Sequence, residues 1–145
     1  MIIAGTFLTG QAPQIRDGVF SVTTGVLNYV DLRVPPAQPG LEPRYFCDLH
    51  LVALMRTEPS DDGKTLGLEV SVEGPDGEPA DVFAAGGDGA PRKRLRAAFT
   101  AGALENELRW IHVRLDVRNP GRHVFSATLT GGSTASVAVE FRFSS

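Results

Sequence analysis

Cysteine, lysine and long apolar runs are scarce in this sequence, and each scarcity narrows the class of protein. Cys47 is the single cysteine, so an internal disulfide is excluded, and with it a disulfide-stapled secreted domain. No apolar stretch approaches the ~18 residues that cross a bilayer. The first residues, MIIAGTFLTG, lack the basic segment and the cleavage pattern of a signal peptide. We therefore expect a cytoplasmic protein with no membrane partner.

Excess positive charge is also lacking. The sequence has 14 Lys and Arg residues against 17 Asp and Glu residues, which leaves a net charge of -3. A nucleic-acid-binding domain needs an electropositive surface, so we expect no nucleic-acid partner. The basic residues are nearly all arginine, and Ala, Gly, Val and Pro are plentiful. This bias is typical of a GC-rich genome and predicts a bacterial source.

Motifs for metal binding and catalysis are missing as well. The histidines, His50, His112 and His123, show no HxH or HExxH spacing and no paired cysteines, so we expect no metal and no cofactor. The sequence has neither a GxSxG nucleophile motif nor a GxxxxGK[ST] phosphate loop. Cys47 and His50 are three residues apart in an extended segment, which places them on opposite faces. An enzyme is accordingly the least favoured interpretation.

What the sequence does contain is an alternation of apolar and polar residues with a period of two, which is typical of strands with one buried face. It is clearest in residues 66–73, LGLEVSVE, and in residues 110–117, WIHVRLDV. Residues 45–55 are apolar at nearly every position, as expected of a central strand. Turns rich in Gly and Pro follow these runs, and residues 109–143 predict a three-strand meander.

These patterns predict the fold class. Many short strands separated by Gly and Pro turns indicate a sandwich or a barrel. The chain has 145 residues, an ordinary length for one domain, so we expect a single domain over residues 1–145. We predict an all-β, two-sheet antiparallel β-sandwich, Ig-like or jelly-roll-like, of about eight or nine strands.

A polar patch is predicted on two of these strands. Asp48 and His50 share one face of the central strand, and Trp110 and His112 share one face of the strand at residues 110–117. If the two strands are neighbours, these four side chains converge into a site for a small molecule or a sugar. The alternative is a solvated outer face of the sandwich, which needs alternating polar residues in any case.

Two charged segments are candidate interaction loops. Arg92, Lys93 and Arg94 follow the glycine-rich residues 84–91, and they would either meet an acidic partner or keep a mobile loop soluble. The glycine-rich residues do not match a phosphate loop in spacing.

Arg16 and Asp17 form the second candidate loop. Asp17 precedes Gly18, and an Asp-Gly pair predicts a tight turn between two strands. Loops on a rigid scaffold commonly carry recognition, so both segments are predicted contact surfaces.

The segment IRDGVFSVTTGVLNYV, residues 15–30, resembles the opening of a family of small uncharacterised bacterial β-sandwich proteins with an RDG-hydrophobic-x-V-x-x-G pattern. The matching residues are Arg16, Asp17, Gly18, Val22 and Gly25. Residues 76–79 and 120–132 are similar to the final hairpin of the same family. The resemblance implies a β-sandwich fold, and it carries over no activity and no site.

Three functions of different classes follow. The leading hypothesis is a non-enzymatic interaction or assembly module that binds a protein partner or forms a homodimer, because no convergent set of catalytic residue types is present. The alternative is a small-molecule or carbohydrate-binding β-sandwich with the polar patch as its site. The third is an enzyme.

Overall fold

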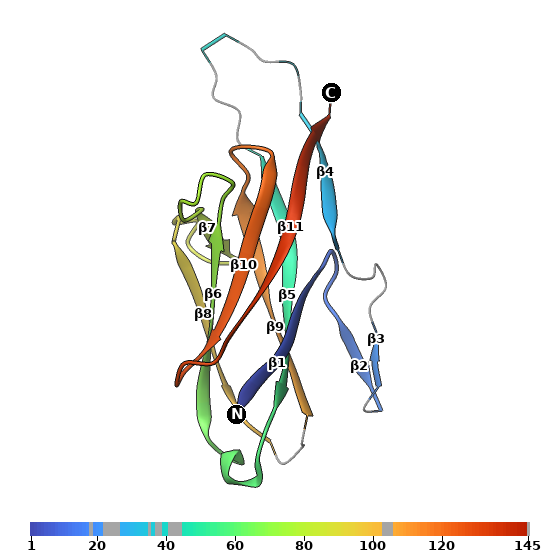
Figure 1. Ribbon diagram of the computed structural model, residues 1–145, viewed down its shortest axis with the longest axis vertical. Helices are drawn as coiled ribbons and strands as arrows, with labels where there is room; N and C mark the ends of the chain where they lie inside the picture. The colour runs from blue at the N-terminus through green and yellow to red at the C-terminus, as the bar shows by residue number, and fades with distance from the viewer. Residues whose placement is uncertain are drawn as a thin grey trace.

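The computed structural model describes the chain in segments, namely residues 1–17, 19–21, 27–34, 36, 39–40, 45–102 and 106–144. Within these segments, two β-sheets lie face to face, and a short hairpin lies to one side of them (Figure 1). No helix of the described residues is long and apolar enough to cross a membrane.

Each sheet mixes strands from distant parts of the sequence. The first sheet has four strands, which are in spatial order β1 (Ile2–Thr9), β5 (Phe46–Arg56), β9 (Asn106–Asp116) and β7 (Val82–Ala84). The second sheet has five strands, which are in spatial order β4 (Tyr29–Arg33), β11 (Thr134–Ser144), β10 (Gly121–Leu129), β6 (Thr65–Glu73) and β8 (Arg94–Thr100). One turn of 3-10 helix, η1 (Pro59–Asp61), lies between β5 and β6.

The predicted two-sheet β-sandwich is confirmed, and its two sheets hold nine strands. The central strand is confirmed too, since β5 lies between β1 and β9 and pairs with both in antiparallel register. One pair departs from the predicted antiparallel pattern, because β4 runs parallel to β11. The alternation in a sequence sets which side chains share a face, and it carries no information on strand direction.

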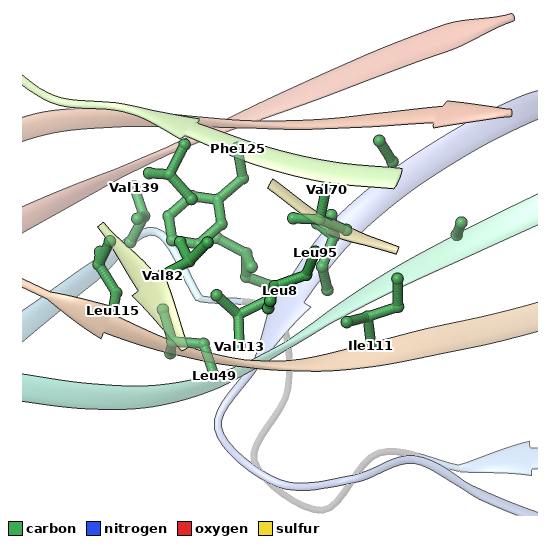
Figure 2. Close-up of a cluster of buried hydrophobic side chains, with 14 of the residues drawn as sticks. Leu8, Leu49, Val70, Val82, Leu95, Ile111, Val113, Leu115, Phe125 and Val139 are labelled. Atoms are coloured by element: carbon green, nitrogen blue, oxygen red, sulfur yellow. The ribbon is translucent and has the colours of Figure 1, made fainter. Parts of the chain in front are cut away.

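The hydrophobic core fills the space between the two sheets. Strand β9 shows how the alternation builds it, because Ile111, Val113 and Leu115 are buried while His112 and Arg114 lie on the outer face. The opposite sheet contributes its own inward-facing set. Figure 2 shows the inward-facing side chains of both sheets meeting. Leu8, Leu49 and Val82 come from the four-stranded sheet, and Val70, Leu95, Phe125 and Val139 come from the five-stranded sheet.

The predicted meander over residues 109–143 is wrong in its first step. Strands β10 and β11 do form an antiparallel hairpin through the turn at Gly131 and Gly132. Strand β9, however, belongs to the other sheet, so the chain crosses the sandwich at residues 117–120. The same kind of crossing follows β6, whose GPDGEP turn bridges Glu73 to Pro79 before the chain enters β7. A Pro-Gly turn between two strands fits a crossing between sheets as well as a reversal within one.

The short hairpin contains β2 (Gln14–Arg16) and β3 (Val19–Ser21). Arg16 pairs with Val19, so the turn spans two residues, and Asp17 has a positive φ of 49°. Positive φ is what a tight hairpin turn requires, and Asp tolerates it better than most residues. The predicted turn is therefore confirmed at Asp17, while Gly18, Val22 and Gly25 of the family pattern lie outside the described residues.

Candidate functional site

The four residues of the predicted polar patch all lie on the outer face of the four-stranded sheet. Strands β5 and β9 are direct neighbours, as the prediction required, and their register places Asp48 opposite Arg114, His50 opposite His112, and Val52 opposite Trp110.

The carboxylate of Asp48 is the centre of this patch. Arg114 donates to it twice, from Nε to Oδ1 at 3.1 Å and from Nη2 to Oδ2 at 3.3 Å. His112 Nε2 donates to the same Oδ1 at 3.0 Å. Hydrogen bonding to Arg114 is the main reason why the pKa of the Asp48 carboxyl is lowered, and the same contact raises the pKa of Arg114. Asp48 and Arg114 are therefore both charged at neutral pH.

His50 extends the patch toward β1. Its ring stacks on His112 with centroids 4.6 Å apart and planes 23° from parallel. Its Nδ1 is buried and has no hydrogen-bond partner among the described residues. Burial, and then the neighbouring His112, lower the pKa of His50, so its ring is neutral at neutral pH. In the described part of the chain, no group of three or more His, Cys, Asp or Glu side chains could hold a metal ion.

Trp110 lies farther along the same face. It faces Val52, which is fully buried although it points away from the core. Neighbouring side chains on the outer face therefore cover Val52, and Trp110 is half-buried beside it.

Cys47 lies on the inner face of β5, where it is buried. The predicted separation of Cys47 from His50 is confirmed, because the His50 side chain belongs to the outer face. Burial raises the pKa of the Cys47 thiol to about 11, so almost no thiolate is present at neutral pH. Cys47 is therefore a core residue.

A groove of about 450 Å³ runs over one end of the outer face. Asp48, His112 and Arg114 of the sheet face line it, together with the glycine-rich loop after β7. The remaining lining residues are Phe46, Phe83, Ala84, Ala85, Gly86, Gly87 and Gly89. Of the four predicted residues, Asp48 and His112 line the groove, while His50 and Trp110 lie outside its lining.

Sequence reasoning missed the two aromatic residues of the groove. Phe46 and Phe83 meet edge to face, with centroids 5.5 Å apart and planes 79° apart. Phe46 has the same period-two phase as Asp48 and His50, so the alternation could have identified it. Phe83 belongs to a strand of three residues, too short to show a period, and it lies on this face because β7 pairs with β9 opposite Arg114.

The predicted basic interaction loop is largely paired within the chain. Lys93 Nζ lies 2.6 Å from Asp81 Oδ1, and Arg92 lies 3.5 Å from Asp88. Arg94 and Arg96 both contact Glu69, at 3.2 and 2.7 Å. An acidic partner would have to compete with these internal carboxylates, which weakens the case for this segment as a docking surface.

A second hollow, of about 570 Å³, lies between the two turns that cross the sandwich. Asp81 pairs there with both Lys93 and Arg118, at 2.6 and 3.0 Å. His123 lines this hollow, is buried, and donates from Nδ1 to the Gly121 carbonyl at 3.1 Å. In this hollow, Lys93 and Arg118 are thus already paired with a carboxylate of the chain, and His123 is bound to the backbone.

The hairpin β2–β3 presents the other predicted loop, with Arg16 and Asp17 exposed at its end. Ile15 and Val19 on the same hairpin are exposed as well, at 50% and 66%. This combination of apolar and charged side chains lies away from the groove.

Comparison of this chain with protein-family models, with curated proteins and with solved structures finds no match. The resemblance of residues 15–30 to a bacterial β-sandwich family therefore stays a prediction.

Proposed function

We propose that this chain is a non-enzymatic interaction module of the bacterial cytoplasm, and that it binds a protein partner through the hairpin β2–β3. The observation that supports the proposal is the exposure of Ile15 and Val19, at 50% and 66%, on a hairpin beside the sandwich (Figure 1). Exposed apolar side chains gain about 25 cal/mol for each Å² that a partner covers. Arg16 and Asp17, at the turn between them, supply the charges that orient a partner.

The test uses a hairpin variant, Ile15→Ser with Val19→Ser, and a matched control, Ile2→Ser with Tyr29→Ser. The control removes two apolar side chains of similar exposure, 45% and 51%, from other strands. Affinity capture from a bacterial extract identifies the partner, and calorimetry then measures its dissociation constant with each purified chain. We expect the hairpin variant to bind at least about tenfold more weakly, as expected of a central contact, and the control to bind normally.

Two outcomes would contradict this proposal. One is equal affinity of the partner for the three chains, and the other is recovery of the wild-type chain without any specific companion. Sedimentation velocity of the purified chain covers the case of a homodimer. A dimer that the hairpin variant converts to monomers would identify the partner as a second copy of the chain.

A second candidate function is small-molecule or carbohydrate binding at the groove. The observation that favours it is the convergence of Asp48, His112 and Arg114 on a hollow of about 450 Å³, which is within the usual range of ligand pockets, about 300–1,000 Å³. This surface is separate from the hairpin, so the two candidates can be tested independently.

A further inference from the structure

The groove holds hydrogen-bonding capacity that the chain itself does not use in the Asp48–Arg114 contact. A guanidinium has five N–H donors, and Arg114 directs two of them at Asp48, which leaves three. Asp48 Oδ2 accepts one hydrogen bond, from Arg114 Nη2, and a carboxylate oxygen has room for a second. Both side chains are about half exposed, Asp48 at 44% and Arg114 at 54%. A donor and an acceptor thus lie side by side and open to the groove.

The charges on the floor of the groove cancel. Asp48 carries one negative charge and Arg114 one positive charge, and their atoms are 3.1 Å apart. An anionic ligand would compete with Asp48 for Arg114, and a cationic ligand would compete with Arg114 for Asp48. An uncharged ligand avoids both kinds of competition. It can use the remaining N–H donors of Arg114 and the lone pair of Asp48 without breaking the ion pair.

Adjacent hydroxyl groups match this donor–acceptor pair. A hydroxyl both donates and accepts, so one hydroxyl of a vicinal diol can accept from Arg114 while its neighbour donates to Asp48 Oδ2. Hydrogen bonds to charged partners are stronger than those between neutral groups.

The aromatic pair supplies an apolar wall beside these polar groups. Phe46 is 44% exposed, and its edge-to-face contact with Phe83 holds the two rings together. A saccharide ring has an apolar C–H face and hydroxyl edges, so it can cover the exposed aromatic surface while its diol meets Asp48 and Arg114.

The loop after β7 contributes small residues to the lining of the groove. Gly86 and Gly89 have positive φ values of 66° and 75°, and no heavy atom lies within 4 Å of where a Cβ would stand. Space for a ligand ring is therefore open beside both glycines.

From these features we infer that the groove binds an uncharged, polyhydroxylated ring, a saccharide unit, with a vicinal diol on Asp48 and Arg114 and its apolar face against Phe46 and Phe83. The inference rests on the second candidate function, and it is independent of the hairpin.

Titrations followed by amide NMR test it, with methyl glycosides of glucose, galactose and mannose as probes. Two matched pairs of probes test the chemistry directly, cis-cyclohexane-1,2-diol against cyclohexanol and methyl glucoside against glucuronate. We expect saturable shifts at the amides of Gly86, Gly87 and His112, with dissociation constants of about 1 mM or below. We also expect the diol to bind better than cyclohexanol, and the neutral sugar better than the charged one.

Three variants separate the site from the fold. Arg114→Lys keeps the charge and loses the planar fork, and Phe46→Ala removes the exposed aromatic wall. Each should weaken glycoside binding at least about tenfold, whereas Tyr29→Ala, an exposed aromatic on the other sheet, should leave it unchanged. Correctly folded variants are recognised by their dispersed amide spectra.

Tighter binding of glucuronate, or equal binding by the three variants, would overturn the inference. If no glycoside shifts the groove amides but a fragment of another class does, the saccharide inference fails while the second candidate function survives. If no small molecule of a fragment library shifts them, both fail. Partner capture by the hairpin is unaffected by any of these results.

Discussion

Arg114 holds Asp48 through two N–H···O contacts that run between neighbouring strands, β9 and β5, on an outer sheet face. The contact lowers the pKa of Asp48, chiefly through the hydrogen bonds from the guanidinium. The charge balance of the candidate site depends on this ion pair, and so do the N–H donors that Arg114 presents to the groove.

Replacing Arg114 by Gln should raise the pKa of Asp48 toward its ordinary value, because the variant removes both the charge and the fork. The measurement is a carbon-detected NMR titration of the Asp48 carboxyl group in the acid range. Asp61 is the internal control, since its pKa is lowered chiefly by the Glu58 backbone N–H at 2.8 Å and it lies in η1, outside the lining of the groove. A titration of Asp48 that is the same in both proteins would show that Arg114 does not hold the carboxylate in solution.

The alternation of the sequence was sufficient to predict which side chains of each strand share a face. Asp48 and His50 occupy the outer face of β5, and His112 occupies the outer face of β9, as expected. Period two is a local property of an extended backbone, so it needs no knowledge of the rest of the fold. The turn at Asp17 was also predicted from local sequence, because an Asp-Gly pair is typical of a tight turn.

Sheet membership could not be predicted in this way. The chain crosses the sandwich between β9 and β10, where a hairpin was expected, and β7 brings Phe83 beside Arg114 from a strand of three residues. Which strands become neighbours depends on long-range packing of two inner faces, and many pairings satisfy the same alternation. The ion pairs of Arg94 and Lys93 with Glu69 and Asp81 are of this long-range kind too.

Stability should fall as the pH falls from about 7.5 to about 5.5, because the fold holds His123, which is buried, and His50, which is partly buried, as neutral rings. Burial lowers the pKa of both His123 and His50 below the ordinary value of 6.5. Between the folded and unfolded pKa values the unfolded chain binds more protons, so acid favours unfolding. The carboxyl groups of lowered pKa add to this loss only at lower pH, through their ordinary range near 4.

Urea unfolding at a series of pH values measures this dependence. His123→Gln removes one titrating ring, so the variant should lose less unfolding free energy over this pH range, whatever its stability at neutral pH. His50→Gln should act in the same direction. An unfolding free energy that is constant or rises toward pH 5.5 in the wild-type chain would contradict the burial of neutral histidines.

The crossing between β9 and β10 ends at Gly121, which has a φ of 128° and lies close to the turn after β6. A Cβ at this position would lie 3.0 Å from Pro75 Cγ and 3.1 Å from Pro75 Cβ. Gly132, in the β10–β11 turn, has a φ of 107°, and no heavy atom lies within 4 Å of its Cβ position. Both glycines therefore have a strained backbone conformation for an alanine, but only Gly121 adds a steric contact.

We expect Gly132→Ala to lower the free energy of unfolding by about 1–3 kcal/mol through backbone strain alone. Gly121→Ala should lower it by about 1–3 kcal/mol more, because its methyl group also presses on the Pro75 ring in a packed turn. Gly5→Ala is the control, since Gly5 has neither a positive φ nor a heavy atom within 4 Å of its Cβ position. Urea unfolding of the three variants gives the comparison. Equal losses for Gly121→Ala and Gly132→Ala would mean that the two crossing turns do not touch in solution, whereas a larger loss at Gly121 would show that the turn after β6 packs against the start of β10.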